Sequence, residues 1–242
     1  MRSDLTGWLL ACVLFPATAM AQQEILVTKL MGSFEHGVGA EYRSNVAAAN
    51  AAVINDKDLE RATTALAPAL RYCDQQQIPG RIAVSVANAE EYDHFMADHH
   101  DGMPVEWIDQ ACPAAYKAAA FIDVERKDFN AAIAMLAKAI AMAPYSPEPL
   151  TEQGFALNQM GRHDEALVNY RKALDLSNAF EAARYAKALS LRGIGFTLVE
   201  LTHLAAAREA YEQSLQVEPG NAIALQELDY IRQREAMGMH NP

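Results

Sequence analysis

The sequence predicts an all-α fold of repeated antiparallel helix pairs, and two observations carry this prediction. A residue pattern recurs at a fixed interval in the second half of the chain, and within each copy small residues alternate with large ones at helical spacing. Small side chains at this spacing lie where two helices approach closely, and the larger ones fill the gap to the next pair. A chain of 242 residues is long enough for several such pairs.

Three copies of the pattern can be aligned. The first contains Ala119-Ala120-Phe121, the second contains Gln153-Gly154-Phe155 about 34 residues later, and the third contains Ile194-Gly195-Phe196. The second-helix positions of these copies are Ala132, Leu136 and Ala139, then Ala166, Tyr170 and Ala173, then Ala207, Tyr211 and Ser214. The expected helix pairs are 114–144, 145–178 and 179–219.

The third copy is longer than the others by about seven residues, which is close to two helical turns. An insertion of this length inside a first helix rotates its face by only about 20°, so the register survives. Asn178 and Glu181 have the spacing of a capping box, and we therefore expect one helix from Ala179 to about Glu200. Asn221 is expected to begin a last helix, within 220–237, that shields the open end of the array.

The pattern resembles the tetratricopeptide repeat (TPR) family, in which a small residue after Leu is followed by Ala, an aromatic residue, Ala and Pro with this period. Residues 147–178 match best, with Gln153 in place of the usual Leu. The resemblance implies a TPR-like α-solenoid, a right-handed superhelix whose first helices line a concave groove for extended or helical peptides. It also implies an adaptor that holds a partner protein or peptide from the same compartment, and not an enzyme.

Residues 40–78 follow the pattern loosely. Ala62, Leu66 and Ala69 have the spacing of a second repeat helix, but Pro68 interrupts that helix. This segment is therefore either a divergent repeat or an unrelated helical hairpin.

Residues 79–113 follow no repeat. Ile82, Val84 and Val86 alternate as in a strand, Asn88 is placed to cap a short helix, and a second strand is expected at 105–108. We therefore expect a small mixed α/β insertion with β-α-β order before the regular repeats.

The first 21 residues have the form of a secretory signal. An apolar stretch ends at Ala19-Met20-Ala21, which is typical of a cleavage site. The alternatives are an uncleaved anchor and, because of Cys12, a lipoprotein signal. The sequence thus predicts an exported protein, periplasmic or secreted, whose residues 22–39 are extended or mobile.

Cys73 and Cys112 are the two cysteines of the predicted mature chain. An oxidising compartment favours a disulfide between them, and the alternative is a pair of buried thiols.

Charge excludes several partners. Lys plus Arg number 20 against 31 Asp plus Glu, which gives a net charge of -11. This charge disfavours nucleic acid and anionic lipid as partners on electrostatic grounds. The predicted mature chain also has no apolar run long enough to span a membrane.

Four aromatic residues occupy equivalent places in the first helices and the last helix: Phe121, Phe155, Phe196 and Tyr230. One interpretation is a row of apolar contacts for a partner. The other is that the rings pack between neighbouring helices as part of the core.

Polar residues accompany this row. Lys117 and Arg192 lie one turn before their rings, and Asn158 lies one turn after Phe155. Family members that capture a C-terminal carboxylate resemble this arrangement but have Asn where this chain has Phe121. A mixed apolar and polar peptide groove is therefore expected in preference to a carboxylate clamp.

Metal and catalytic signals are weak. His94 and Asp98 have i, i+4 spacing and could share a metal with His99 or His100, but these residues also describe a solvated helix end. Glu106 and Asp109 are interpreted as the polar face of their segment. No catalytic motif is present and no cofactor is expected. The competing hypothesis is a ligand-binding or catalytic protein whose activity resides in 79–113.

Overall fold

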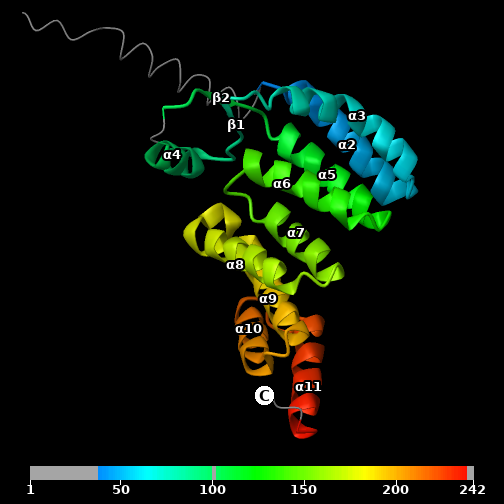
Figure 1. Ribbon diagram of the computed structural model, residues 1–242, viewed down its shortest axis with the longest axis vertical. Coiled ribbons are helices and arrows are strands. Elements are labelled where there is room, and N and C mark those ends of the chain that lie inside the picture. The colour runs from blue at the N-terminus through cyan, green and yellow to red at the C-terminus, as the bar shows by residue number, and fades with distance from the viewer. Residues whose placement is uncertain (1–37, 100–101, 239–242) are drawn as a thin grey trace, which may run out of the picture.

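The computed structural model describes residues 38–99 and 102–238, and it consists of helix pairs stacked one after another along a long axis (Figure 1). The pair of α2 (Arg43–Ala51) and α3 (Leu59–Gln75) lies at one end, and α11 (Ala222–Ala236) lies at the other. The predicted signal, Cys12 included, and residues 22–37 fall outside the described ranges. Within those ranges, no helix combines the length and apolarity needed to cross a bilayer.

The N-terminal hairpin has the register that the sequence indicates. Its elements are η1 (Ala40–Tyr42), α2, the π-helical continuation η2 (Ala52–Asp56) and α3. Ala62, Leu66 and Ala69 of α3 are all buried, as their spacing predicts. Asp58 caps α3 by accepting a hydrogen bond from the Arg61 backbone N–H, and the helix continues through Pro68.

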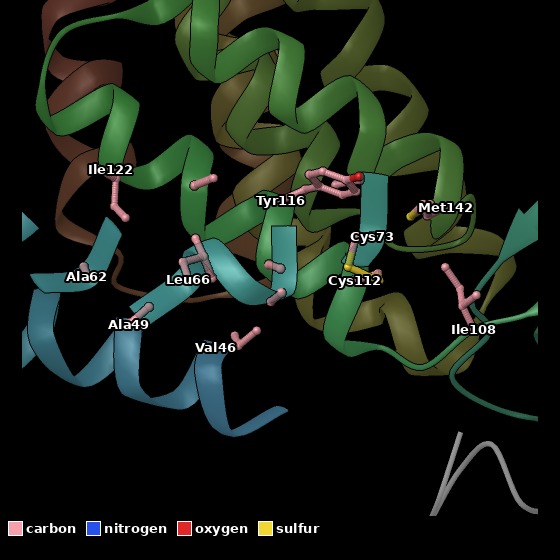
Figure 2. Packing of buried hydrophobic residues seen from close by; sticks show 14 of the residues in the cluster. Val46, Ala49, Ala62, Leu66, Cys73, Ile108, Cys112, Tyr116, Ile122 and Met142 are labelled. Atoms are coloured by element: carbon pink, nitrogen blue, oxygen red, sulfur yellow. A yellow bond between two sulfur atoms is a disulfide. The ribbon is translucent and has the colours of Figure 1, made fainter. Parts of the chain in front are cut away.

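A disulfide joins Cys73 at the end of α3 to Cys112 at the start of α5 (Ala111–Glu125), with their Cα atoms 5.4 Å apart. Both sulfurs belong to the core between the hairpin and α5, which also contains Leu66 and Tyr116 (Figure 2). The alternative of two buried thiols is therefore not what the structure contains.

The insertion forms two short parallel strands, β1 (Ile82–Val84) and β2 (Val105–Trp107), with α4 (Ala89–Asp98) between them in sequence. Asn88 caps α4 as expected, since its side chain accepts a hydrogen bond from the Glu91 backbone N–H. Val86 is buried but lies beyond the strand. The Ser85 backbone N–H donates to the carbonyl of Met142, which ties the insertion to α6 (Phe129–Met142).

Asp109 is a buried structural residue, and its interpretation as part of the polar face of its segment was wrong. It is 1% exposed, and its carboxylate accepts hydrogen bonds from the Arg43 guanidinium and from the Ala111 backbone N–H at 2.8 Å. These contacts fix α2 to the start of α5. Glu106 does lie nearer the surface, where it pairs with Arg81.

The regular pairs follow the predicted packing. They are α5 with α6, α7 (Glu148–Gln159) with α8 (His163–Ala179), and α9 (Lys187–Glu200) with α10 (Leu204–Val217). The expected small residues of the second helices are buried in all three pairs. The Tyr170 ring lies between Gly154 of α7 and Gly193 of α9, where any added Cβ would collide with it. Tyr211 lies against Gly195 in the same way, so each large ring fills a gap that glycine opens.

The turn between the two helices of each regular pair repeats as well. Lys127, Gly161 and Thr202 occupy equivalent positions, and all three have left-handed backbone, with φ of 61°, 71° and 62°. Only Gly161 adopts this conformation without steric cost. The backbone geometry of the turn is therefore imposed by the repeat and not by the residue type.

The expected single helix from Ala179 to Glu200 was wrong. Asn178 lies inside α8, which runs to Ala179, and the chain then passes through extended Phe180 into η3 (Glu181–Ala186) before α9 begins. Phe180 is 4% exposed, and its ring centroid lies 4.8 Å from that of His94 and 5.0 Å from that of Tyr145. The chain leaves the helix because Phe180 is buried in this aromatic cluster.

The last helix begins as predicted. The Asn221 side chain accepts a hydrogen bond from the Ala224 backbone N–H at 3.1 Å. Ala224 and Ile231 are buried against the preceding pair, whereas Leu225 on another side of the helix is 49% exposed. The helix thus covers the open end of the array with one face.

Candidate functional site

The four aromatic side chains of the predicted row are accessible to solvent. Phe121 and Phe155 are each 45% exposed, and Phe196 and Tyr230 are each 40% exposed. They stand on α5, α7, α9 and α11 respectively. In the three regular pairs the preceding residue is buried in the helix contact, and the ring that follows it is half-exposed. We call these four side chains the aromatic row.

Two adjoining hollows lie along the N-terminal part of the aromatic row. One has a volume of about 470 Å³, is walled by Phe121, Phe155 and Leu189, and has Leu136 and Tyr170 among its lining residues. The other has a volume of about 270 Å³. It is lined by side chains of α2, η2, α5 and α7, among them Asn50, Val53, Ile54, Lys117 and Ala118. Phe121 and Glu152 line both hollows, which we together call the groove.

The two basic residues predicted beside the row already have acidic partners. Lys117 Nζ lies 2.9 Å from a carboxylate oxygen of Glu148 on the next first helix. Arg192 donates to Glu218 in the same manner. A clamp for a partner's C-terminal carboxylate needs cations that are available to it, so these pairs weigh against that arrangement.

Asn158 lies in a helix contact and not on the groove surface. It is 8% exposed, and its side-chain N–H donates to Thr197 Oγ1 at 2.9 Å. Its side-chain oxygen lies 3.0 Å from His163 Nδ1. Asn158 therefore joins α7 to α9 through buried polar contacts, which makes it a structural residue.

Glu152 is a groove residue that the sequence analysis did not identify. Burial raises the pKa of Glu152 to about 7, while the positive charge of Lys117 lowers that pKa and the negative charge of Glu148 raises it. Among the residues that the structure describes, no hydrogen bond to its carboxylate is found. The sequence does contain an indication of this position, because Glu152 precedes Phe155 by three residues and therefore lies on the same helix face.

Glu227 repeats this arrangement on α11. It precedes Tyr230 by three residues, as Glu152 precedes Phe155. Burial raises the pKa of Glu227, and the nearby charge of Glu200 raises it further. Half-buried carboxylates thus accompany two of the four rings.

The weak metal candidates do not form a cluster. His94 packs against Phe180, and His99 Nε2 lies 2.9 Å from the carbonyl oxygen of Met103. In residues 38–99 and 102–238, no group of three or more His, Cys, Asp or Glu side chains is arranged to hold a metal ion. Asp98 ends α4, and the neighbouring His100 and Asp101 lie outside these ranges.

Comparison with known proteins gives matches over part of the chain. Residues 146–217 match the family described as tetratricopeptide repeat. The small glutamine-rich tetratricopeptide repeat-containing protein 2 of Mycosarcoma maydis is 31% identical over 97 residues, which are 40% of this chain and 26% of that protein. The chain therefore spans about a quarter of the length of this curated relative.

Solved structures also match this chain, and one of them shares its helical-repeat fold with a TM-score above 0.5. PilF of Pseudomonas aeruginosa matches with a TM-score of 0.57 and 16% identity, over 81% of this chain and 69% of that chain. The first TPR domain of Spaghetti (RPAP3), solved with the HSP90 peptide SRMEEVD, matches with a TM-score of 0.48 and 23% identity, over 53% of this chain and 96% of that chain. At 16% identity the likeness to PilF concerns the fold alone.

Proposed function

Because residues 146–217 carry tetratricopeptide repeats, we propose that this chain is an interaction adaptor that holds a partner protein or peptide against its aromatic row. The observation that carries the proposal is the exposure of all four rings at equivalent places on successive first helices and on α11. A row of this kind presents separate contacts to one extended or helical partner segment.

The energetic argument concerns the apolar area that a partner would cover. Phe121, Phe155 and Leu189 border one hollow, and each is between 45% and 48% exposed. Covering a large apolar side chain in a fully desolvated contact contributes on the order of 1 to 3 kcal/mol. Clustered exposed apolar side chains of this kind mark interaction surfaces more often than isolated ones do.

The adaptor is further proposed to act after export, in the periplasm or outside the cell. The disulfide between Cys73 and Cys112 supports this, because such bonds persist in oxidising compartments and are rare in the cytosol. The sequence Ala19-Met20-Ala21 supports it independently. N-terminal sequencing of the mature protein should give Gln22 first. An intact N-terminus in the cytosol would contradict export, and a lipid-modified Cys12 would indicate a lipoprotein.

The test of the adaptor role removes two rings. The double variant Phe155→Ser, Phe196→Ser should lose the crosslinked partner that wild type captures in its native compartment, identified by mass spectrometry. Val168→Ser is the matched control, because Val168 is 64% exposed on the second helix α8 and lines neither hollow. Circular dichroism and melting should be unchanged in both variants. Undiminished capture by a folded double variant would contradict the proposal.

A further inference from the structure

The groove carries an acidic character that bears on the chemistry of its partner. Glu152 and Glu125 line it, and Glu148 lies beside it. The cation among its lining residues, Lys117, is paired with Glu148. Among the residues that line the groove, the charge that remains without a partner of opposite sign is therefore negative.

Glu152 occupies the place where this charge has most effect. It lines both hollows together with Phe121, and it is partly buried. Within the described part of the chain, its carboxylate receives no hydrogen bond. A partly buried carboxylate without hydrogen bonds is energetically unfavourable, and a cationic donor that reached it would remove that cost.

The neighbouring rings suit the rest of such a donor side chain. Phe121 and Glu152 border the same hollows, and Phe155 lies one helical turn beyond Glu152. The methylene stem of a lysine or arginine packs on aromatic surface while its charged head reaches a polar group. The ring faces also attract the cation itself.

We infer that the groove binds a partner segment in which a lysine or arginine reaches Glu152 and adjacent apolar residues cover Phe121 and Phe155. This inference rests on the proposed adaptor function and specifies the chemistry of the partner. It excludes an acidic segment as the preferred ligand, because Glu152 and Glu125 would repel it and Lys117 is already paired.

The same arrangement recurs farther along the aromatic row. Glu227 and Tyr230 on α11 have the relation that Glu152 and Phe155 have on α7. Arg234 already lies over the Tyr230 ring and donates to its hydroxyl, so a second basic residue of a partner would there reach the carboxylate of Glu227 and not the ring. Multiple weak contacts along one segment raise its overall affinity.

The experiment selects peptides from a random phage-displayed library on the full chain. The selected peptides should be enriched in lysine or arginine next to apolar residues. Fluorescence anisotropy should show that Glu152→Gln weakens their binding by about tenfold or more. Glu212→Gln is the matched control, because Glu212 is exposed on the second helix α10 and should leave affinity unchanged. Replacing the basic residue of the peptide by norleucine should abolish the difference between wild type and Glu152→Gln.

The outcomes separate this inference from the proposed function. Peptides that depend on Phe155 but have no basic excess, or that bind Glu152→Gln as tightly as wild type, would overturn the inference and leave the adaptor role standing. Enrichment of acidic C-terminal peptides would likewise overturn the inference and leave the adaptor role standing. The absence of any Phe155-dependent peptide would overturn both, and self-association lost in Phe155→Ser would assign the groove to a second copy of this chain.

Discussion

The N-terminal region, residues 38–113, and the aromatic row of the helix pairs that follow it use aromatic side chains in opposite ways. In the N-terminal region the rings face one another, with centroids 4.5 Å apart for Tyr42 and Tyr72 and 5.0 Å apart for Tyr92 and Trp107. In the aromatic row, the described part of the chain offers no aromatic partner to Phe121 or Phe155. Paired rings stabilise the fold, whereas unpaired rings leave apolar surface for another molecule.

The carboxylates of Asp74 and Asp109 in the N-terminal region have hydrogen-bond partners within the fold, whereas Glu152 in the groove has none in the described part of the chain. Burial alone would raise the pKa of Asp74, yet hydrogen bonds from Lys138 and Tyr116 hold it below its usual value. Asp109 is likewise bonded by Arg43. In the groove, burial raises the pKa of Glu152, the charge of Lys117 lowers it only in part, and the described part of the chain offers its carboxylate no hydrogen-bond donor. Asp74 and Asp109 of the N-terminal region therefore bind donors within the fold, whereas the carboxylate of Glu152 can accept a hydrogen bond from a ligand.

Removing the disulfide should have the largest effect on stability, and this effect should be confined to the N-terminal region. The variant Cys73→Ala, Cys112→Ala should lose about 2 to 4 kcal/mol of unfolding free energy, because the closed loop no longer constrains the unfolded chain. The two cysteines belong to the core around α3 and α5, and α9 and α10 share a different core. Amide hydrogen exchange should therefore accelerate in α3 and remain slow in α10. Equal acceleration in both helices would contradict two separately stabilised regions.

Filling a glycine gap should perturb the regular pairs specifically. A Cβ on Gly193 would overlap the Tyr170 ring, so Gly193→Ala should cost about 1 to 3 kcal/mol in chemical unfolding. The cost should shrink when Tyr170→Leu is introduced as well, because the smaller side chain leaves room. An equal cost in both backgrounds would show that Tyr170 is not the obstacle.

The pH dependence of the unfolding free energy should reveal the cost of burying the charged carboxylate of Glu152. Its pKa is raised from 4.5 to about 7 in the folded protein, so the folded state binds more protons than the unfolded state between these values. Stability should therefore fall as the pH rises through this window, and Glu152→Gln should remove that decrease. After allowance for solvent screening, the variant should gain on the order of 1 to 2 kcal/mol at about pH 8. A parallel decrease in wild type and variant would contradict the assignment.

Thr202→Gly should give the smallest effect, and like Glu152→Gln at about pH 8 it should stabilise the protein. Thr202 has a φ of 62°, a conformation that a β-branched residue adopts at a cost, and Gly161 fills the equivalent turn. The substitution should raise the unfolding free energy by about 0.5 to 1 kcal/mol, measured as a higher melting temperature. A lower melting temperature would indicate that the Thr202 side chain contributes contacts that outweigh its backbone strain.

The periodic parts of the fold could be predicted from the sequence because local spacing determines them. Ala132, Leu136 and Ala139 recur at helical spacing, and all three are buried in α6. The caps at Asn88 and Asn221 follow from residue type and position alone. The exposure of the aromatic row also agrees with its place in the repeat.

The remaining features depend on contacts between residues that are distant in sequence. Phe180 ends α8 because His94 and Tyr145 surround it, and no local pattern contains that information. Asp109 has a charged side chain of a type usually found at the surface. Only the fold, which brings Arg43 beside it, explains its burial. In the sequence, Glu152 cannot be told from a solvent-exposed glutamate of an amphipathic helix. Its burial results from the stacking of successive first helices, which the local sequence does not reveal.

The most direct measurement of the central claim is photo-crosslinking from defined positions in the native compartment. A benzophenone amino acid replaces Phe155 in the groove, Val168 on α8 or Met96 in the insertion, all of which are exposed. We predict a partner adduct from position 155 and none from position 168 or position 96. Adducts from position 96 alone would place partner binding in the insertion and contradict the account.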